Sequence, residues 1–227
     1  MAEGREEQVI KAVILDFDGT LAELNLDFSA MKEKILNLIE EYGIARDCLR
    51  EGYILEIIDE VTSVLLKKDR PLAELFAEKA QKMLREKELE AASESRLLPG
   101  VESMLRNLRS AGVKVGIITR NCDGAVRRIC AHIESLCDAF LSRDSVERVK
   151  PDPRHLATLL DRLGVTVEGA IMVGDHPMDI LAGKRVGMRT VGVLTGRTTR
   201  DQFLETGADY VLESASQLPG LIERLNQ

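Results

Sequence analysis

Two kinds of apolar pattern alternate along most of the chain. Short continuous apolar runs, typical of buried strands, are separated by amphipathic segments with helical spacing. The runs are 9–15, 113–118, 139–141, 170–173, 190–194 and 210–212. Strands that alternate with helices form parallel sheets, because each crossover between parallel strands needs a long connection. The pattern therefore predicts an α/β fold with a Rossmann-like parallel sheet.

Proline and glycine mark the ends of several predicted helices. Pro153 and Pro177 stand where a helix can begin without losing a hydrogen bond. Gly164 and Gly187 follow helical segments and are suited to end them. The helices predicted between the strands include 101–108, 125–133, 153–163 and 177–186.

One long region interrupts the alternation of strands and helices. Between residues 22 and 98 no segment has the pattern of a strand, and helical patterns run over 28–42, 49–67 and 71–90. In the middle segment the apolar residues share one helical face: Ile54, Ile57, Ile58, Val61, Val64 and Leu65. We therefore expect a helical domain at 22–98, inserted into an α/β core made of 1–21 and 99–227.

Composition adds information about partners and location. Acidic residues outnumber basic ones, 38 to 31, the net charge is −7 and the pI is near 5.2. Nucleic-acid-binding proteins usually present a basic surface, so we expect no nucleic-acid partner. No apolar run approaches the ~20 residues that a membrane span needs, and residues 1–8 contain no signal-peptide core. We expect a cytoplasmic protein that does not contact membranes. The oligomeric state is not predicted.

The first apolar run ends on two aspartates. Asp16 and Asp18 follow the run directly, and Gly19 then allows the chain to turn. Burying unpaired carboxylates is costly, so a buried strand should end this way only at an open edge or beside a cation. The residues that follow the other strands favour the cation.

Polar residues follow the other predicted strands as well. Ligands of open α/β sheets bind at the carboxyl ends of the strands, so residues at these ends are expected to lie together. They are Asp16 and Asp18 after the first strand, Thr119, Arg120 and Asn121 after the second, Lys150 in the segment after the third, and Asp175 and Asp179 after the fourth.

This set of residues suits phosphoryl transfer. A carboxylate that attacks phosphorus divides one difficult displacement into two easier ones, and we assign this nucleophilic role to Asp16. Asp18 is placed to give a proton to the leaving oxygen and to take one from water. Thr119 offers a hydroxyl to a phosphate oxygen, and Lys150 neutralises its charge. Arg120 and Asn121 are candidate substrate contacts, although Arg120 is equally suited to an ion pair with the inserted domain.

Attack of one anion on another also requires a metal ion. Carboxylate and carbonyl oxygens favour Mg²⁺, and we expect Asp16, Asp175 and the main-chain carbonyl of Asp18 to bind it. Asp179 has three interpretations from sequence. It could orient Lys150, orient a metal-bound water, or simply favour the start of its helix through the helix dipole.

Four short motifs, in this order and each after a predicted strand, resemble the signature motifs of the haloacid dehalogenase-like (HAD) hydrolase superfamily. They are Asp16-Phe17-Asp18-Gly19-Thr20-Leu21, Ile117-Ile118-Thr119, Lys150-Pro151, and Gly174-Asp175 with Asp179. The resemblance covers nearly the whole chain. It implies a HAD-like core, and it implies that the inserted helices are a cap domain of the first type, which closes over the active site. It also implies the residue roles given above.

Within the superfamily, the layout is most similar to phosphoglycolate phosphatase-like and phosphoglucomutase-like enzymes. Many phosphoglycolate phosphatases continue the first motif with Val-Asp-Ser, whereas this chain has Ala22-Glu23-Leu24. The resemblance therefore does not transfer a substrate. We predict a Mg²⁺-dependent phosphatase that hydrolyses a small phosphorylated metabolite through an aspartyl-phosphate on Asp16.

Other functions fit the sequence less well. A sugar-phosphate mutase of the same superfamily shares the whole residue set and stays open. A non-catalytic phospho-aspartate regulatory protein would not need both Asp16 and Asp18. The chain also has no G-x-x-x-x-G-K-[ST] loop, no G-x-S-x-G elbow and no C-x-x-C pair, which argues against a P-loop enzyme, a serine hydrolase and a zinc site.

Overall fold

The computed structural model describes residues 9–50 and 52–227, and this part of the chain divides into two compact units. The core unit comprises the residues up to Leu24 together with Ala92–Gln227. The helical unit comprises Asn25–Ala91.

The described residues of the core unit form a six-stranded parallel sheet with the order β3-β2-β1-β4-β5-β6. The predicted α/β fold is confirmed, and each of the predicted apolar runs forms a strand. The strands are β1 (Ala12–Leu15), β2 (Lys114–Ile118), β3 (Ala139–Leu141), β4 (Ala170–Gly174), β5 (Arg189–Val193) and β6 (Tyr210–Leu212). β1 lies at the centre, where the direction of strand order reverses, and such a switch point is where open α/β sheets bind ligands.

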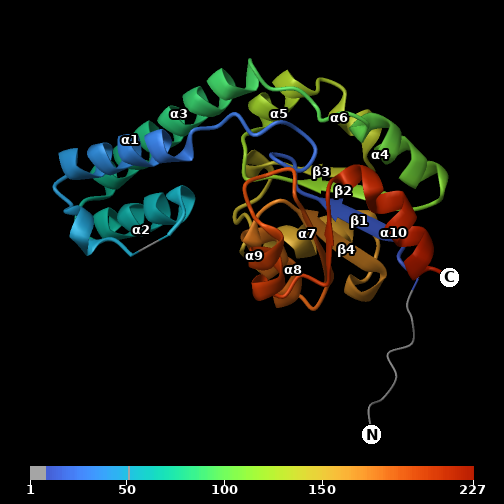
Figure 1. The fold of residues 1–227 in the computed structure, drawn as a ribbon. Coiled ribbons are helices and arrows are strands. Elements are labelled where there is room, and N and C mark those ends of the chain that lie inside the picture. The colour runs from blue at the N-terminus through green and yellow to red at the C-terminus, as the bar shows by residue number, and fades with distance from the viewer. Residues whose placement is uncertain (1–8, 51) are drawn as a thin grey trace, which may run out of the picture. The chain divides into compact units, whose positions relative to one another are not determined.

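Helices cover both faces of this sheet (Figure 1). One face packs against α4, α5, α6 and α10, and the opposite face packs against α7 and α8. The helices of the core unit are α4 (Val101–Ser110), α5 (Asp123–Ile129), α6 (Ile133–Leu136), α7 (Pro153–Leu163), α8 (Pro177–Arg185), α9 (Arg200–Thr206) and α10 (Leu218–Leu225). Short 3-10 turns are η2 (Arg143–Ser145), η3 (Val167–Gly169) and η4 (Ala215–Gln217).

Side chains of β5 alternate between the two faces of the sheet, as the strand period requires. Val191 and Val193 belong to the cluster on the α4 and α10 face. Gly192 points the other way, and a Cβ atom there would lie 2.5 Å from Cγ of Phe203 in α9. The glycine therefore makes room for α9 to pack against the sheet.

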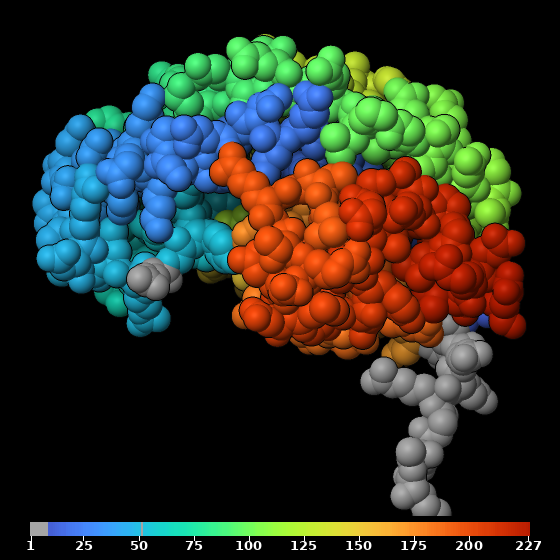
Figure 2. Space-filling model, in the orientation of Figure 1, coloured from blue at the N-terminus to red at the C-terminus, as the bar shows by residue number. Residues whose placement is uncertain are grey.

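In Figure 2, C-terminal residues, coloured orange to red, form most of the visible surface of the core unit.

The predicted helix at 125–133 is wrong in one respect, because the structure divides it. α5 ends at Ile129, Cys130 adopts an extended backbone, and α6 begins at Ile133. Cys130, Ile133 and Leu136 are all buried in the same hydrophobic cluster. These side chains therefore stay in the core on both sides of the break.

The helical unit consists of α1 (Phe28–Glu41), η1 (Arg46–Cys48), α2 (Ile54–Leu66) and α3 (Arg70–Ala92). Its interior is a cluster of aliphatic side chains around Phe76, whose ring packs edge-on against Tyr42 at a centroid distance of 5.2 Å. The helix predicted at 49–67 begins later, at Ile54. Val64, which the pattern places on the buried face, is 38% exposed.

No helix among the described residues has both the length and the apolar character needed to cross a membrane.

Candidate active site

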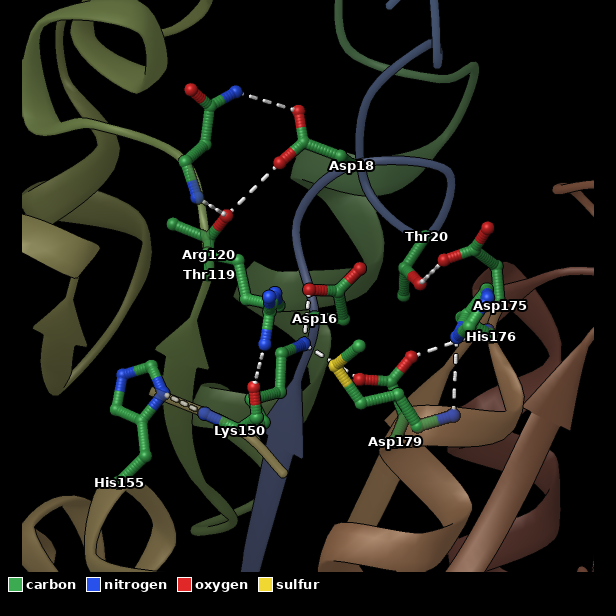
Figure 3. Close-up of polar contacts among 12 residues, drawn as sticks. Asp16, Asp18, Thr20, Thr119, Arg120, Lys150, His155, Asp175, His176 and Asp179 are labelled. Atoms are coloured by element: carbon green, nitrogen blue, oxygen red, sulfur yellow. Dashed lines mark hydrogen bonds and ion pairs between the residues drawn. The ribbon is translucent and has the colours of Figure 1, made fainter. Parts of the chain in front are cut away.

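The carboxyl ends of the central strands lie at one level of the sheet. Leu15 is in register with Ile117 of β2 and with Val173 of β4. Asp16 therefore leaves β1 beside the ends of both neighbours, where Thr119 and Asp175 follow. Figure 3 shows the side chains of these residues gathered at this edge, together with Lys150 and Asp179.

A tight turn directly after β1 fixes the backbone at Asp16 and Asp18. The carbonyl of Phe17 accepts hydrogen bonds from the amides of Thr20, Leu21 and Ala22, and the Phe17 ring is fully buried. Gly19 has a φ of +81°, a conformation that costs glycine little. The buried ring anchors the turn, so the two carboxylates project from a fixed backbone.

Lys150 joins two of the carboxylates. Its Nζ donates to Oδ1 of Asp16 and to Oδ1 of Asp179, the second at 2.6 Å, and the residue is 2% exposed. The backbone of Lys150 is fixed as well, because its N–H donates to Nδ1 of His155 at 3.1 Å and its carbonyl accepts from Nη1 of Arg120. The ammonium group is therefore held between the two acids.

Among the described residues, Asp16, Asp175 and Asp179 are buried and offer carboxylate oxygens that all lie within 4.8 Å of one another. Burial raises the pKa of Asp16 well above its ordinary value, although Lys150 opposes the shift, and the neighbouring carboxylates raise it further. Burial, followed by the charge of Asp179, raises the pKa of Asp175 to about 7. Full ionisation of the three carboxylates would give more negative charge than one lysine balances, and a bound cation would favour the ionised form.

Burial tends to lower the pKa of Lys150, but the attraction of Asp16 and Asp179 outweighs it, so the net direction is upward. The lysine is therefore a fixed positive charge at neutral pH. His155 has the opposite character, since burial and the nearby Lys150 lower the pKa of its imidazole to about 3. It contributes no charge and serves as a hydrogen-bond acceptor for the lysine backbone.

Glycines surround the carboxylates closely. A Cβ atom at Gly196 would lie 2.0 Å from Oδ2 of Asp175, and one at Gly19 would lie 2.3 Å from the same oxygen. At Gly174 a Cβ would lie 2.2 Å from Oδ2 of Asp179. A larger residue at any of these three positions would therefore push a carboxylate out of its place. The excess of negative charge and the oxygen-only donors fit a hard divalent cation such as Mg²⁺.

Asp18 lies slightly apart from this cluster and is half-buried. Its Oδ2 accepts a hydrogen bond from Oγ1 of Thr119 at 2.9 Å, and its Oδ1 accepts one from Nδ2 of Asn121 at 3.0 Å. The site thus contains two groups, a carboxylate cluster around Lys150 and a second acid held by the loop after β2.

Asp179 has two partners that match two of the interpretations open from sequence. Its Oδ1 accepts from Lys150, and its Oδ2 accepts from the backbone N–H of His176 at 3.2 Å in a capping box at the start of α8. Arg120 contacts the lysine backbone, as described above, and its own carbonyl accepts from Nη1 of Arg143 at 2.8 Å.

Comparison with known proteins identifies the family. A family model described as haloacid dehalogenase-like hydrolase matches residues 13–193, which is most of the chain. The chain belongs to the haloacid dehalogenase-like hydrolases. The resemblance inferred from its four motifs is confirmed.

Named relatives of this HAD hydrolase match over nearly its full length. It is 29% identical to a phosphoglycolate phosphatase of Xanthomonas campestris, covering 92% of this chain and 94% of that one. It is also 29% identical to the pyrophosphatase PpaX of Bacillus velezensis, with the same shares covered. The predicted enzyme class, a HAD-type phosphatase, is confirmed. A hydrolase structure from Pseudomonas syringae shares the fold, with a TM-score of 0.65, 20% identity, and coverage of 96% of this chain and 100% of that one.

Sequence reasoning missed some residues that shape the site of this HAD hydrolase. Thr195 donates from Oγ1 to the carbonyl of Gly19 at 2.5 Å, and the next residue, Gly196, lies against Asp175. Thr20 also approaches Asp175, with 3.4 Å between Oγ1 and Oδ1. The Thr195-Gly196 pair directly follows a predicted strand, so the strand-end rule that found the other residues could have found it.

Proposed function

We propose that this protein is a Mg²⁺-dependent phosphatase that hydrolyses a small phosphorylated metabolite through an aspartyl-phosphate on Asp16. The observation that carries the proposal is the placement of Lys150 between Asp16 and Asp179, beside Asp175, at the carboxyl edge of the sheet. The names of the relatives, phosphoglycolate phosphatase and pyrophosphatase, support a small phosphorylated substrate.

Asp16 is the proposed nucleophile. Lys150 binds its Oδ1, and we assign attack on phosphorus to Oδ2. In the first step the bond between Oδ2 and phosphorus forms, the bond between phosphorus and the ester oxygen breaks, and Asp18 gives its proton to the leaving oxygen. In the second step water attacks phosphorus and gives a proton to Asp18, and the bond to Asp16 breaks. Inorganic phosphate is released.

Other residues of the site hold charge during these steps. We assign the ammonium of Lys150 to the oxygens of the transferring group. The hydroxyl of Thr119 donates to Asp18 in this structure and would reach a phosphate oxygen only after its proton turns away from that carboxylate. Asp16, Asp175 and the carbonyl of Asp18 would hold Mg²⁺, with Asp179 orienting Lys150. When bound, the ion neutralises charge between the carboxylate and the phosphate and aligns them.

The helical unit is proposed to be the cap. We interpret the inserted segment, predicted at 22–98, as a domain that closes over bound substrate, excludes bulk water and contributes most of the specificity. The cytoplasmic location, the absence of nucleic-acid and membrane partners, and the domain bounds 1–21 and 99–227 for the core stay predictions.

The proposal is tested with a panel of phosphorylated metabolites, including phosphoglycolate, sugar phosphates, nucleotides and pyrophosphate. We expect Mg²⁺-dependent phosphate release from at least one of them, and we expect Asp16→Asn to abolish it while circular dichroism stays native. Asp161→Asn, at an exposed position of α7, is the matched control. Activity retained by the Asp16→Asn variant would overturn the proposal. Isomerisation of a hexose phosphate without phosphate release would indicate the mutase instead.

A further inference from the structure

The carboxylate of Asp18 is held on both of its oxygens by the loop after β2. Thr119 donates to Oδ2 and Asn121 donates to Oδ1, at 2.9 and 3.0 Å. Figure 3 shows Asp18 turned toward Thr119 and away from Lys150. Two donors from one short loop fix both the position and the plane of the carboxylate, whereas one donor would leave it free to rotate.

The side-chain amide of Asn121 has a defined orientation. Its Oδ1 accepts a hydrogen bond from the backbone N–H of Cys122 at 2.9 Å. Since the amide oxygen faces this donor, the amide nitrogen faces Asp18. The backbone of Asn121 is fixed too, because its carbonyl accepts from the N–H of Arg143 in η2 at 3.1 Å.

Asn121 also directs the hydroxyl of Thr119. The backbone N–H of Asn121 donates to Oγ1 of Thr119 at 2.9 Å. The hydroxyl already accepts this hydrogen bond, and its single proton points to Oδ2 of Asp18. Both contacts to Asp18 therefore depend on Asn121, one through its side chain and one through its backbone.

We propose that Asn121 is a positioning residue for Asp18, and that it acts on proton transfer rather than mainly on substrate binding. This inference rests on the proposed function, in which Asp18 protonates the leaving oxygen. A carboxyl displaced by a fraction of an ångström transfers a proton less effectively, so the loss of Asn121 lowers the rate of the chemical step. Esters whose leaving oxygen is a stable anion need little protonation and are affected least.

The experiment compares Asn121→Ala with the unaltered protein on two substrates, an alkyl phosphate and p-nitrophenyl phosphate. General acid catalysis contributes ~10²–10⁴-fold, and we expect loss of positioning to lower kcat/KM for the alkyl ester by about 10–100-fold. We expect kcat/KM for the nitrophenyl ester to change less than about threefold, because this ratio reports formation of the aspartyl-phosphate, and a nitrophenolate leaves without needing a proton. Hydrolysis of the aspartyl-phosphate, which also uses Asp18, is common to both esters, so kcat is not the quantity compared. Asn107→Ala, at an exposed position of α4, is the control.

A second variant protects the test against misfolding. Asn121→Asp keeps the size of the side chain and an oxygen for the amide of Cys122, but it replaces the donor to Asp18 with an acceptor. We expect the same difference between the two esters. Equal losses of kcat/KM for both esters would show a substrate contact and overturn the inference.

A double-mutant cycle separates this inference from the proposed function. In the background of Asp18→Asn, the change Asn121→Ala should produce no further loss with the alkyl ester, since residues that act as one unit are not additive. A further loss of the same size contradicts positioning. The proposed function fails by a different result, namely that Asp18→Asn lowers kcat/KM for both esters alike or that Asp16→Asn retains activity.

Discussion

The core unit and the helical unit differ in the kinds of side chain that they bury. Beside the ends of β1 and β4 the core unit encloses Asp16, Lys150 and Asp179, each less than 10% exposed. The helical unit packs aliphatic side chains such as Ile39 around the ring of Phe76. Apolar burial stabilises a fold, whereas buried charge does so weakly even when paired. We infer that the buried charges of the core serve the proposed chemistry, whereas the helical interior serves stability.

The largest expected effect is that of Lys150→Met. The change leaves Asp16 and Asp179 without their shared cation, and breaking a buried ion pair from one side costs about 3–5 kcal/mol. We expect at least a ~1,000-fold loss of phosphatase activity together with a lower free energy of unfolding in urea. Lys184→Met, which removes a half-exposed pair with Asp209, is the control and should cost about 0–1 kcal/mol. Comparable losses in the two variants would contradict the assigned role.

A substitution in the interior of the helical unit should lower stability without preventing the chemical step. Phe76 is fully buried in its hydrophobic cluster, and truncation of a buried aromatic ring costs about 3–5 kcal/mol. We expect Phe76→Ala to lower the free energy of unfolding by this amount and to leave the folded fraction able to form the aspartyl-phosphate, measured by mass spectrometry of acid-quenched protein. Phe28→Ala, at a position 43% exposed, is the matched control. Loss of the intermediate in fully folded Phe76→Ala would break the proposed division of roles.

The buried acids should make stability depend on pH. The pKa of Asp175 is raised from 3.8 to about 7, so the folded state binds more protons than the unfolded state between these values. The contribution of Asp175 to the free energy of unfolding should therefore fall as pH rises from about 4 to about 7, by up to about 1.4 kcal/mol per pH unit when metal is chelated. His155, whose pKa is lowered from 6.5 to about 3, contributes in the opposite direction below its unfolded value. Urea unfolding of the unaltered protein and of Asp175→Asn across this range isolates the contribution of Asp175 as the difference between their slopes, and Mg²⁺ should reduce this difference; equal slopes would exclude Asp175 as a source.

The smallest expected effect is that of Gly196→Ala. The added Cβ would lie 2.0 Å from Oδ2 of Asp175, so the carboxylate must move. Changes beside metal ligands typically weaken metal binding about 10–100-fold, and we expect this loss in Mn²⁺ binding followed by electron paramagnetic resonance. Gly220→Ala is the control, because a Cβ there meets nothing within 4 Å. Equal affinities in both variants would exclude Gly196 from the metal site.

The sequence predicted the sheet and the location of the site because both follow from short-range signals. An apolar run such as that before Asp16 identifies a buried strand, and the strand-end rule brings Thr119 and Asp175 to the same edge. Contacts that depend on packing were not predictable in this way. The break of the predicted helix at Cys130 is one example, because no proline or glycine lies at this point of the sequence.

The contact between Gly196 and Asp175 also depends on tertiary structure. It requires the pairing of β4 with β5 and a specific turn after β5, which no spacing in the sequence encodes. The bond from Asn121 to Asp18 likewise depends on the orientation of one amide, which its neighbour Cys122 fixes. Sequence patterns identify which residues are near one another, and packing decides which of them touch.

The central place of β1 has a consequence for the synthesis of the protein. β1 is synthesised well before its neighbours in the sheet, which are residues 114–117 and 170–173. The nascent chain must carry an unpaired apolar segment until translation is well past β4, and such segments are prone to aggregate. Chaperone binding to β1 is therefore expected during this interval, and a prematurely terminated chain that lacks β4 would have Asp16 without the Asp175 and Asp179 that lie beside it.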